Sequence, residues 1–284
     1  MQFDYNAAFS RNIGWVTESE QQILRSTRIA IAGLGGVGGN HLLTLARLGI
    51  GAFHIADFDT FDLVNFNRQA GATVSTLGQS KLEVMTRQAR DINPELKIKG
   101  FADGVTADNL DAFLDGVALY VDGLDFFAFQ ARRQVFAACA RRGIPAVTAA
   151  PLGMGVAVLN FLPGRMSFEE YFRLEDGSEA EMPLRFLMGL APARLQMGYL
   201  ADPSTIDLAN CKGPSTTMAC QLCAGVAATE ALKILLGRGR VRAAPWGYHF
   251  DAYRAKLALT WRPGGNRNPL QCLAIAMAKR KLGL

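Results

Sequence analysis

The chain has 284 residues, half of them hydrophobic, and a formal net charge of +5 at pH 7, so it can bury one large core. No stretch approaches the roughly 18 uninterrupted apolar residues of a membrane span, and Asp4 and Asn6 stand where a signal peptide would be apolar. The basic residues are scattered, without the dense stripe typical of nucleic-acid binding. A soluble cytoplasmic protein is therefore expected, with neither a membrane nor a nucleic acid as partner.

Short apolar runs alternate with segments of helical periodicity through the first half of the chain. Strands are expected at residues 28–32, 52–56, 96–101, 117–121 and 146–149, and helices at 40–48, 81–92, 108–114 and 127–142. Strands separated by helices of this length need crossover connections, which make neighbouring strands parallel. The sequence therefore predicts an α/β fold, a Rossmann-like doubly wound and mainly parallel sheet with helices on both faces.

The pattern divides the chain into four segments. Residues 1–27 are expected to form an arm and a helix, and 28–163 the nucleotide-binding core. Residues 164–217 are irregular and broken by four prolines, which favours a crossover insertion lying over the active face. Residues 218–284 are expected to add remaining strands, a long helix at 218–236 and an amphipathic helix at 270–284, all on the core.

A glycine-rich loop follows the first expected strand and opens a helix, and its glycines are Gly33, Gly35, Gly36 and Gly38. In such a loop the first glycine permits a tight turn, the second lets the backbone approach phosphate, and the third lets helix and strand pack closely. Asp57 ends the next strand, about 20 residues on, where a carboxylate accepts ribose hydroxyls. Together they predict a nucleotide site, which a nicotinamide enzyme and an ATP enzyme would share.

The residues beyond Asp57 distinguish these two classes. Four motifs follow the glycine loop in order, and they are Asp57-Phe58-Asp59, Asn65-Phe66-Asn67-Arg68-Gln69, Lys81 and Asp122-Gly123-Leu124-Asp125. The set closely resembles the ThiF/MoeB/HesA family of ubiquitin-activating-type adenylating enzymes, over residues 11–162 and again over 211–237. The resemblance implies ATP and Mg²⁺ as cofactors.

The resemblance also implies roles for single residues. Arg68 and Lys81 would contact the triphosphate, and the pairs Asp57/Asp59 and Asn65/Gln69 would line the nucleotide site. Asp125 would hold Mg²⁺ with support from Asp122. Arg11 matches an arginine that reaches into the ATP site of the other subunit in relatives, which implies a homodimer.

The cysteines are odd in number, which fits reduced thiols. Cys211 falls where relatives keep a cysteine that takes a thioester or persulfide, but a cysteine in a loop can also be incidental, so its covalent role stays open. Cys220 and Cys223 share the apolar face of one expected helix and are interpreted as buried thiols. Cys220 and Cys223 have the spacing of half a zinc site, but zinc-containing relatives carry two separated CxxC pairs and this sequence lacks that arrangement, so structural zinc is not expected.

The predicted reaction joins a carboxylate to Mg·ATP, giving an acyl-adenylate and pyrophosphate. By resemblance the carboxylate is the C-terminus of a ubiquitin-like or sulfur-carrier protein, or of a small peptide. Three alternatives remain, namely a binding subunit without activity, an NAD(P)-dependent oxidoreductase, and a sulfurtransferase that depends on Cys211. The oxidoreductase leaves Arg68, Lys81 and Asp125 without a role.

Overall fold

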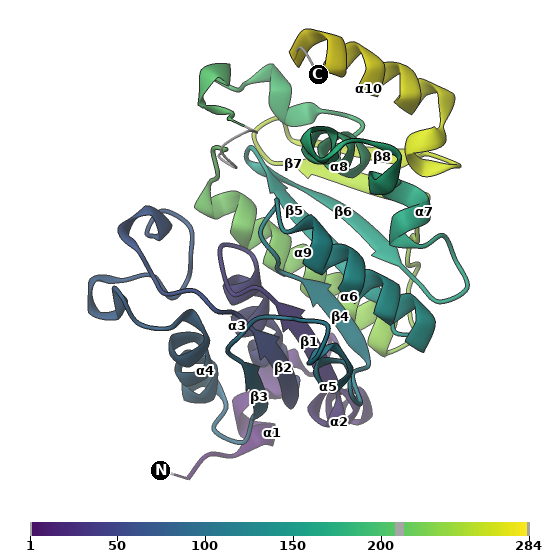
Figure 1. Ribbon diagram of the computed structural model, residues 1–284. Helices are drawn as coiled ribbons and strands as arrows, with labels where there is room; N and C mark the ends of the chain where they lie inside the picture. Colours follow the sequence, from purple (N-terminus) through teal and green to yellow (C-terminus); the bar gives the residue numbers. More distant parts are fainter. Residues whose placement is uncertain (1, 208–212, 283–284) are drawn as a thin grey trace. The chain divides into compact units, whose positions relative to one another are not determined.

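The computed structural model describes residues 2–207 and 213–282, and the chain divides into two compact units (Figure 1). The first unit comprises Met1–Leu124 and Ala224–Val241, and the second comprises Asp125–Cys223 and Arg242–Leu284.

The first unit is built on a parallel sheet of four strands in the order β3-β2-β1-β4. The strands are β1 (Arg28–Ala32), β2 (Ala52–Ala56), β3 (Lys97–Phe101) and β4 (Leu119–Asp122). Strands β2 and β4 are buried at every residue, and their apolar sequences suit strands that are covered on both faces. Ala32 is in register with both Ala56 and Asp122, so the carboxyl ends of three strands meet at one edge.

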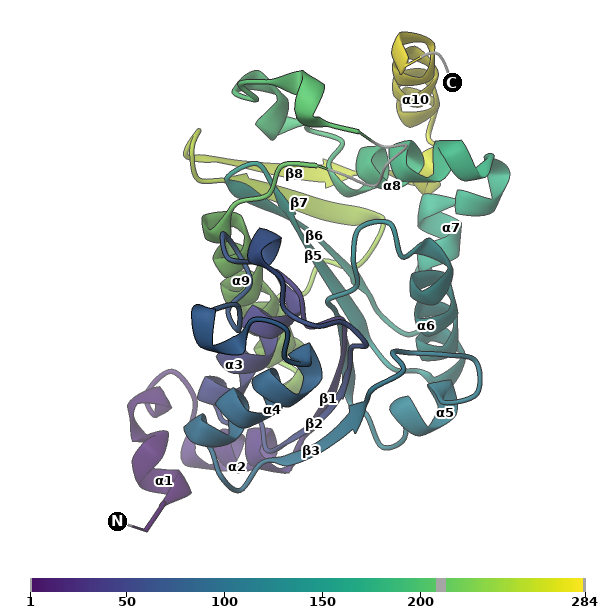
Figure 2. The ribbon, with the colours of Figure 1, turned by 60° about the vertical axis from the view of Figure 1, so that its left-hand side comes forward.

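Helices cover both faces of this sheet, as Figure 2 shows for α4 and α5. The helices that lie wholly in this unit are α1 (Tyr5–Ala8), α2 (Glu18–Ser26), α3 (Gly38–Leu48), α4 (Lys81–Ile92) and α5 (Leu110–Phe113). On one face, Leu82 of α4 lies against Gly100 of β3. On the other, Phe113 of α5 makes edge-on ring contacts with Phe101 and Tyr120. This arrangement confirms the predicted Rossmann-like α/β fold.

The second unit contains four antiparallel strands in the order β5-β6-β7-β8. Its strands are β5 (Ala146–Leu152), β6 (Gly155–Phe161), β7 (Trp246–Asp251) and β8 (Lys256–Trp261), and its helices are α6 (Phe129–Arg142), α7 (Phe168–Phe172), α8 (Met182–Leu190) and α10 (Pro269–Leu282). β5 runs three residues beyond the predicted strand, because it pairs with β6 in a tight hairpin that includes Pro151. Helix α10 packs on α8 through Ile275, Leu184 and Met188.

Helix α9 (Thr217–Leu235) begins in the second unit and continues into the first. It is long and apolar enough to cross a membrane by length and composition alone, but 44% of its apolar window is buried inside the structure. Cys220 and Cys223 lie on its buried face, which confirms their prediction as buried thiols, and burial raises the pKa of the Cys223 thiol. The helix residues outside this buried face are half-buried or exposed.

Candidate nucleotide-binding site

The glycine loop joins β1 to α3 at the carboxyl edge of the first unit's sheet. Gly33 adopts a positive φ of 82°, and its N–H donates to the carbonyl of Ala56 at 2.7 Å. A Cβ on Gly38 would overlap the carbonyl oxygen of Gly33, and one on Gly33 would overlap Gly123. Both glycines are thus required by the packing of the loop, α3 and the end of β4, as the sequence predicted for the third glycine.

Gly35 differs from these two glycines because the protein leaves room for a side chain there. A Cβ at this position would meet nothing closer than the Gln69 amide nitrogen, at 3.6 Å, and its φ is not positive. The N-cap residue of α3, Val37, makes no side-chain capping hydrogen bond. Backbone N–H groups and the positive end of a helix dipole therefore face a space that suits an anion.

Gly36 is the glycine of this loop whose main chain is held by the helix that follows it. Its carbonyl accepts a hydrogen bond from Nδ2 of Asn40, in the first turn of α3, at 2.6 Å, and the residue is half-buried. This hydrogen bond fixes the turn that leads into α3, and it occupies the Gly36 carbonyl. The predicted contact of Gly36 with the nucleotide is left to its N–H, and it stays a prediction.

Asp57 fixes the glycine loop to the end of β2. Its Oδ2 accepts a hydrogen bond from the N–H of Leu34 at 2.6 Å, and its Oδ1 accepts one from the N–H of Asp59 at 2.9 Å. Burial raises the pKa of the Asp57 carboxyl, and these two hydrogen bonds oppose the rise. Each oxygen keeps a second lone pair, so the carboxylate can also accept a ribose hydroxyl.

Lys81 is the first residue of α4 and its side chain is only 8% exposed. Its Nζ lies 2.9 Å from Oδ2 of Asp59, whose side chain is 53% exposed. A cation at a helix N-terminus is opposed by the helix dipole, and burying it costs free energy unless it is paired. Asp59 stabilises an ammonium that the local structure otherwise disfavours, which points to a role in binding.

The segment between Asp59 and Lys81 holds the other predicted contacts. Gln69 is 8% exposed and lies against Gly35, and its Oε1 has no hydrogen-bond partner among the described residues. Such an acceptor costs about 1–3 kcal/mol when left unpaired. A nucleotide donor that reached it would recover that free energy.

Asn65 and Arg68 are held locally in the same segment. The Asn65 side chain accepts the N–H of Asp62 at 3.0 Å in a short 3₁₀ turn, so it shapes the segment. Arg68 donates to the carbonyl of Val64 at 3.0 Å and forms no ion pair with the residues that the structure describes. Its half-buried guanidinium keeps its remaining donors for an anion.

Asp122 ends β4 and is 4% exposed. It accepts hydrogen bonds from the hydroxyl of Tyr120 and the N–H of Leu124, both at 3.2 Å, so it holds the turn that leads to Asp125. Nearby, the fully buried ring of His41 has no hydrogen-bond partner at either nitrogen among the described residues. Burial lowers the pKa of His41 to about 4, although Asp122 opposes the shift, so the ring is neutral at pH 7.

Asp125 begins the second unit and is exposed. Its Oδ1 accepts the N–H of Phe127 at 3.0 Å. Its main-chain carbonyl accepts from Nη2 of Arg132 at 2.9 Å, and the carbonyl of Phe126 accepts from Nη1 of the same side chain at 3.2 Å. Arg132 is 2% exposed and its guanidinium lies over the ring of Phe186, 4.8 Å from the centroid.

Sequence reasoning missed Arg132, yet a signal was present. Arg132 shares the buried face of α6 with Val135, Phe136 and Cys139, at spacings of three, four and seven residues. An arginine on an otherwise apolar helix face indicates a guanidinium with fixed partners.

The structure brings together most of the predicted site within the first unit, from the glycine loop through Asp57, Asp59 and Gln69 to Lys81. Arg11 lies in an exposed 3₁₀ turn of the N-terminal arm (Ser10–Asn12), and its role stays a prediction. Cys211 falls outside the described residues.

Comparison with known proteins decides the family. The ThiF family model matches residues 9–272, which is nearly the whole chain. The chain belongs to the ThiF family. This confirms the resemblance on which the site prediction depended.

Curated relatives of this ThiF protein match about half of its length, and it spans about half of theirs. The tRNA threonylcarbamoyladenosine dehydratase of Bacillus subtilis is 32% identical over 141 residues, which cover 49% of this chain and 55% of that protein. The sulfur carrier protein ThiS adenylyltransferase of Escherichia coli is 29% identical over 143 residues, covering 50% and 56%.

Solved structures extend the likeness over more of the chain. The E. coli tRNA N6-threonylcarbamoyladenosine dehydratase, TcdA, in complex with ATP is 25% identical with a TM-score of 0.60, covering 82% of this chain and 95% of that one. E. coli MccB with ATP shares the fold, with 19% identity, a TM-score of 0.65 and coverage of 92% and 73%.

Proposed function

We propose that this ThiF-family protein is an ATP-dependent adenylyltransferase that activates a carboxylate. A carboxylate oxygen attacks the α-phosphorus of ATP and forms the new P–O bond. The bond from that phosphorus to the oxygen bridging the α- and β-phosphates breaks, and pyrophosphate leaves with the electron pair. The buried, Asp59-paired Lys81 at the site carries this proposal.

The residues of the first unit supply the binding and the charge that this reaction needs. The N–H groups of the glycine loop and the N-terminus of α3 receive phosphate oxygens, and Asp57 receives the ribose. Lys81 and Arg68 neutralise the charge that grows on the departing pyrophosphate. A triphosphate that approached Lys81 would take over the ammonium from the exposed carboxylate of Asp59.

The residues fit a magnesium ion held chiefly by the nucleotide. No three His, Cys, Asp or Glu side chains converge in the part of the chain that the structure describes. Magnesium is commonly bound through one or two carboxylates together with phosphates and water. Asp125, exposed and with one oxygen engaged by Phe127, is the residue that would hold it, and the ion would neutralise phosphate charge.

We infer that the carboxylate is the C-terminus of a carrier protein or a peptide. The ThiS adenylyltransferase is a relative, and MccB has been solved with MccA-N7isoAsn. In the second unit, β7 and β8 present one face of large apolar side chains that are half-buried or exposed, and a docked protein would cover them. These paired residues are Trp246, Tyr248, Phe250, Leu257, Leu259 and Trp261.

A second candidate substrate is a carboxylate on a tRNA nucleoside. The relatives with 32% and 35% identity are tRNA threonylcarbamoyladenosine dehydratases, and the threonine of a threonylcarbamoyl group is linked through its nitrogen and keeps a free carboxylate. The same acyl-adenylate chemistry would serve it, but the partner would be RNA.

ATP–pyrophosphate exchange tests the function and separates the substrates. Purified protein with Mg²⁺, ATP and labelled pyrophosphate is given small carriers ending in Gly-Gly, short peptides, or tRNA containing threonylcarbamoyladenosine. Exchange with a carrier or peptide supports the first candidate, and exchange with the tRNA alone supports the second. Absence of exchange with every substrate, in a protein that binds NADH more tightly than ATP, would refute the proposal.

The active unit is proposed to be a homodimer in which Arg11 reaches the partner's site. Two exposed apolar features of the first unit support this, because Trp15 beside Arg11 is 84% exposed and Val74 beyond Arg68 is 85% exposed. Mixing inactive Arg11→Ala and Lys81→Ala proteins should restore activity at one of the two sites of each heterodimer. Failure to restore it after verified subunit exchange would contradict the shared site.

A further inference from the structure

Strand β3 forms an open edge of the first unit's sheet. It is the last strand in the order β3-β2-β1-β4, and none of its residues is fully buried. Lys97 donates its N–H to Gly51, and Phe101 accepts the N–H of Asp57, so these residues bond towards β2. Because bonding direction alternates along a strand, the N–H and C=O groups of Ile98 and Gly100 point to the open side.

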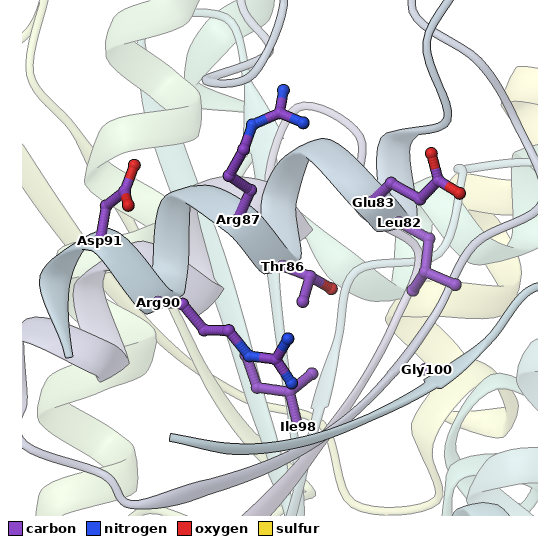
Figure 3. A pocket seen from close by; sticks show the side chains of 8 residues that line it. All are labelled: Leu82, Glu83, Thr86, Arg87, Arg90, Asp91, Ile98 and Gly100. Atoms are coloured by element: carbon purple, nitrogen blue, oxygen red, sulfur yellow. The ribbon is translucent and has the colours of Figure 1, made fainter. Parts of the chain in front are cut away.

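A groove lies between this strand and α4 (Figure 3). It is open, has a volume of about 420 Å³, and includes Leu82, Thr86, Arg90, Ile98 and Gly100. Figure 3 shows Leu82, Thr86 and Arg90 pointing from the helix towards the strand, whereas Glu83, Arg87 and Asp91 of the same groove point away from it. The groove thus combines an apolar floor with one cationic side chain and free backbone groups.

The charges at this edge are mostly positive and not neutralised. Arg90 forms no ion pair with the residues that the structure describes, and Lys97 and Lys99 on β3 are exposed. Lys99 lies over the ring of Phe101. A second copy of the same edge would bring like charges together, which disfavours pairing between two copies. An acidic partner would be attracted.

We propose that the open edge of β3 and the α4–β3 groove together form a docking site for an extended, acidic segment of another protein, which adds to the sheet as a further strand. Backbone hydrogen bonds to Ile98 and Gly100 give affinity. Side chains on one face of the added strand enter the groove near Arg90, and those on the other meet Lys97 and Lys99. A polypeptide strand can pair with the open N–H and C=O groups of Ile98 and Gly100, whereas a nucleic-acid backbone has no N–H donor for them, which favours a peptide.

The site is separate from the nucleotide site, although α4 borders both. Lys81 starts this helix, and Arg90 lies nine residues further along it. The inference therefore does not depend on the proposed reaction, and Arg90→Glu should leave carrier-dependent pyrophosphate exchange unchanged.

A fluorescein-labelled decapeptide of alternating valine and glutamate is a direct probe, read by fluorescence anisotropy with the full-length protein. Saturable binding is expected, with at least tenfold weaker binding to Arg90→Glu. The matched control is Arg87→Glu, one turn earlier on the same helix and pointing away from the strand, which should change the dissociation constant less than threefold. Hydrogen exchange at the amides of Ile98 and Gly100 should slow when the peptide is bound.

Two further probes separate strand addition from charge attraction. The same peptide with N-methyl groups on alternate residues keeps its charges but loses the donors of one edge, and one of the two alternations should bind at least tenfold more weakly. The proposal is overturned if both N-methylated peptides bind as well as the parent, if Arg90→Glu binds normally, or if no binding occurs at millimolar peptide. It is also overturned if a ten-nucleotide single-stranded RNA binds more tightly than the peptide.

Discussion

The cations near the two ends of helix α4 differ in burial and in pairing. At its start, Lys81 is buried and paired with Asp59, whereas nearer its end Arg90 is exposed and has no ion pair among the described residues. A buried, paired cation is held in one geometry and suits one ligand, whereas an exposed cation adapts to varied partners at a small free-energy cost. We therefore interpret the buried, paired Lys81 as a residue that binds the nucleotide and the exposed Arg90 as a residue that binds a protein partner.

The largest effect is expected from removing the buried cation. Lys81→Ala should lower carrier-dependent pyrophosphate exchange at least 100-fold, since loss of one fixed contact to a charged transition state costs about 3 kcal/mol. Lys99→Ala removes an exposed lysine of β3 and should leave exchange within twofold of the unchanged protein. An equal loss of exchange activity in the two variants would show that burial does not separate a nucleotide-binding lysine from a surface lysine.

Arg132 extends the comparison to a buried cation that donates hydrogen bonds to main-chain carbonyls. Arg132→Gln should lower the free energy of unfolding by about 2–3 kcal/mol, because the carbonyls of Asp125 and Phe126 lose charged donors. If Arg132 also positions Asp125, the magnesium concentration for half-maximal exchange should rise severalfold.

Arg133→Gln is the matched control for this variant. It removes half-exposed ion pairs with Glu169 and Glu175, and such pairs contribute about 0.2–1 kcal/mol. An unchanged magnesium requirement in a folded Arg132→Gln protein would restrict Arg132 to a structural role.

His41 is a buried titratable group whose ring nitrogens have no hydrogen-bond partner among the described residues. Burial therefore disfavours protonation of the ring in the folded protein. Its pKa is about 6.5 in an unfolded chain and about 4 in the folded protein, so the folded state binds fewer protons between these values. The stability is therefore full above pH 6.5 and falls as the pH drops towards 4. By pH 5 the loss amounts to about 2 kcal/mol.

Urea unfolding at pH 7 and pH 5 checks the His41 prediction. The unchanged protein should lose about 2 kcal/mol more on acidification than His41→Leu does. Identical pH dependence in the two proteins would mean that the ring is hydrated or paired in solution.

The smallest effect is expected at Gly35, where the protein leaves room for a methyl group. Gly35→Ala should fold normally but bind ATP about tenfold more weakly, because the new methyl group occupies space that the protein leaves to phosphate. Gly38→Ala should instead lower the yield of folded protein, since its Cβ overlaps the Gly33 carbonyl. Isothermal titration with ATP measures the affinity of the Gly35→Ala protein. An unchanged affinity would mean that the phosphates do not bind beside Gly35.

Much of the first unit could be predicted from sequence because its determinants are local. Strands β1 and β2 have the bounds that their apolar runs indicated, and the glycine loop, Asp57 and Lys81 stand where the motifs placed them. The role of Asn65 as the acceptor of a 3₁₀ turn, and the unpaired Oε1 of Gln69, depend on folded contacts that spacing does not reveal.

Strand β7 shows why the second unit was harder to predict. Its alternation places the polar His249 and Asp251 on the buried face and leaves the aromatic Trp246, Tyr248 and Phe250 half-exposed. This inverts the usual relation between hydrophobicity and burial on which a sequence-based assignment depends. Asp251 is stabilised there by the hydroxyl of Tyr199, 2.6 Å away and 52 residues distant in sequence.

A crystal structure of the protein with Mg²⁺ and a non-hydrolysable ATP analogue would show directly which residues bind the triphosphate. We expect the α-phosphate at the N-terminus of α3, the ribose on Asp57, and the Lys81 ammonium turned from Asp59 to the outer phosphates. Outer phosphates far from Lys81 and Arg68, or a nicotinamide dinucleotide retained in the same place, would contradict this expectation.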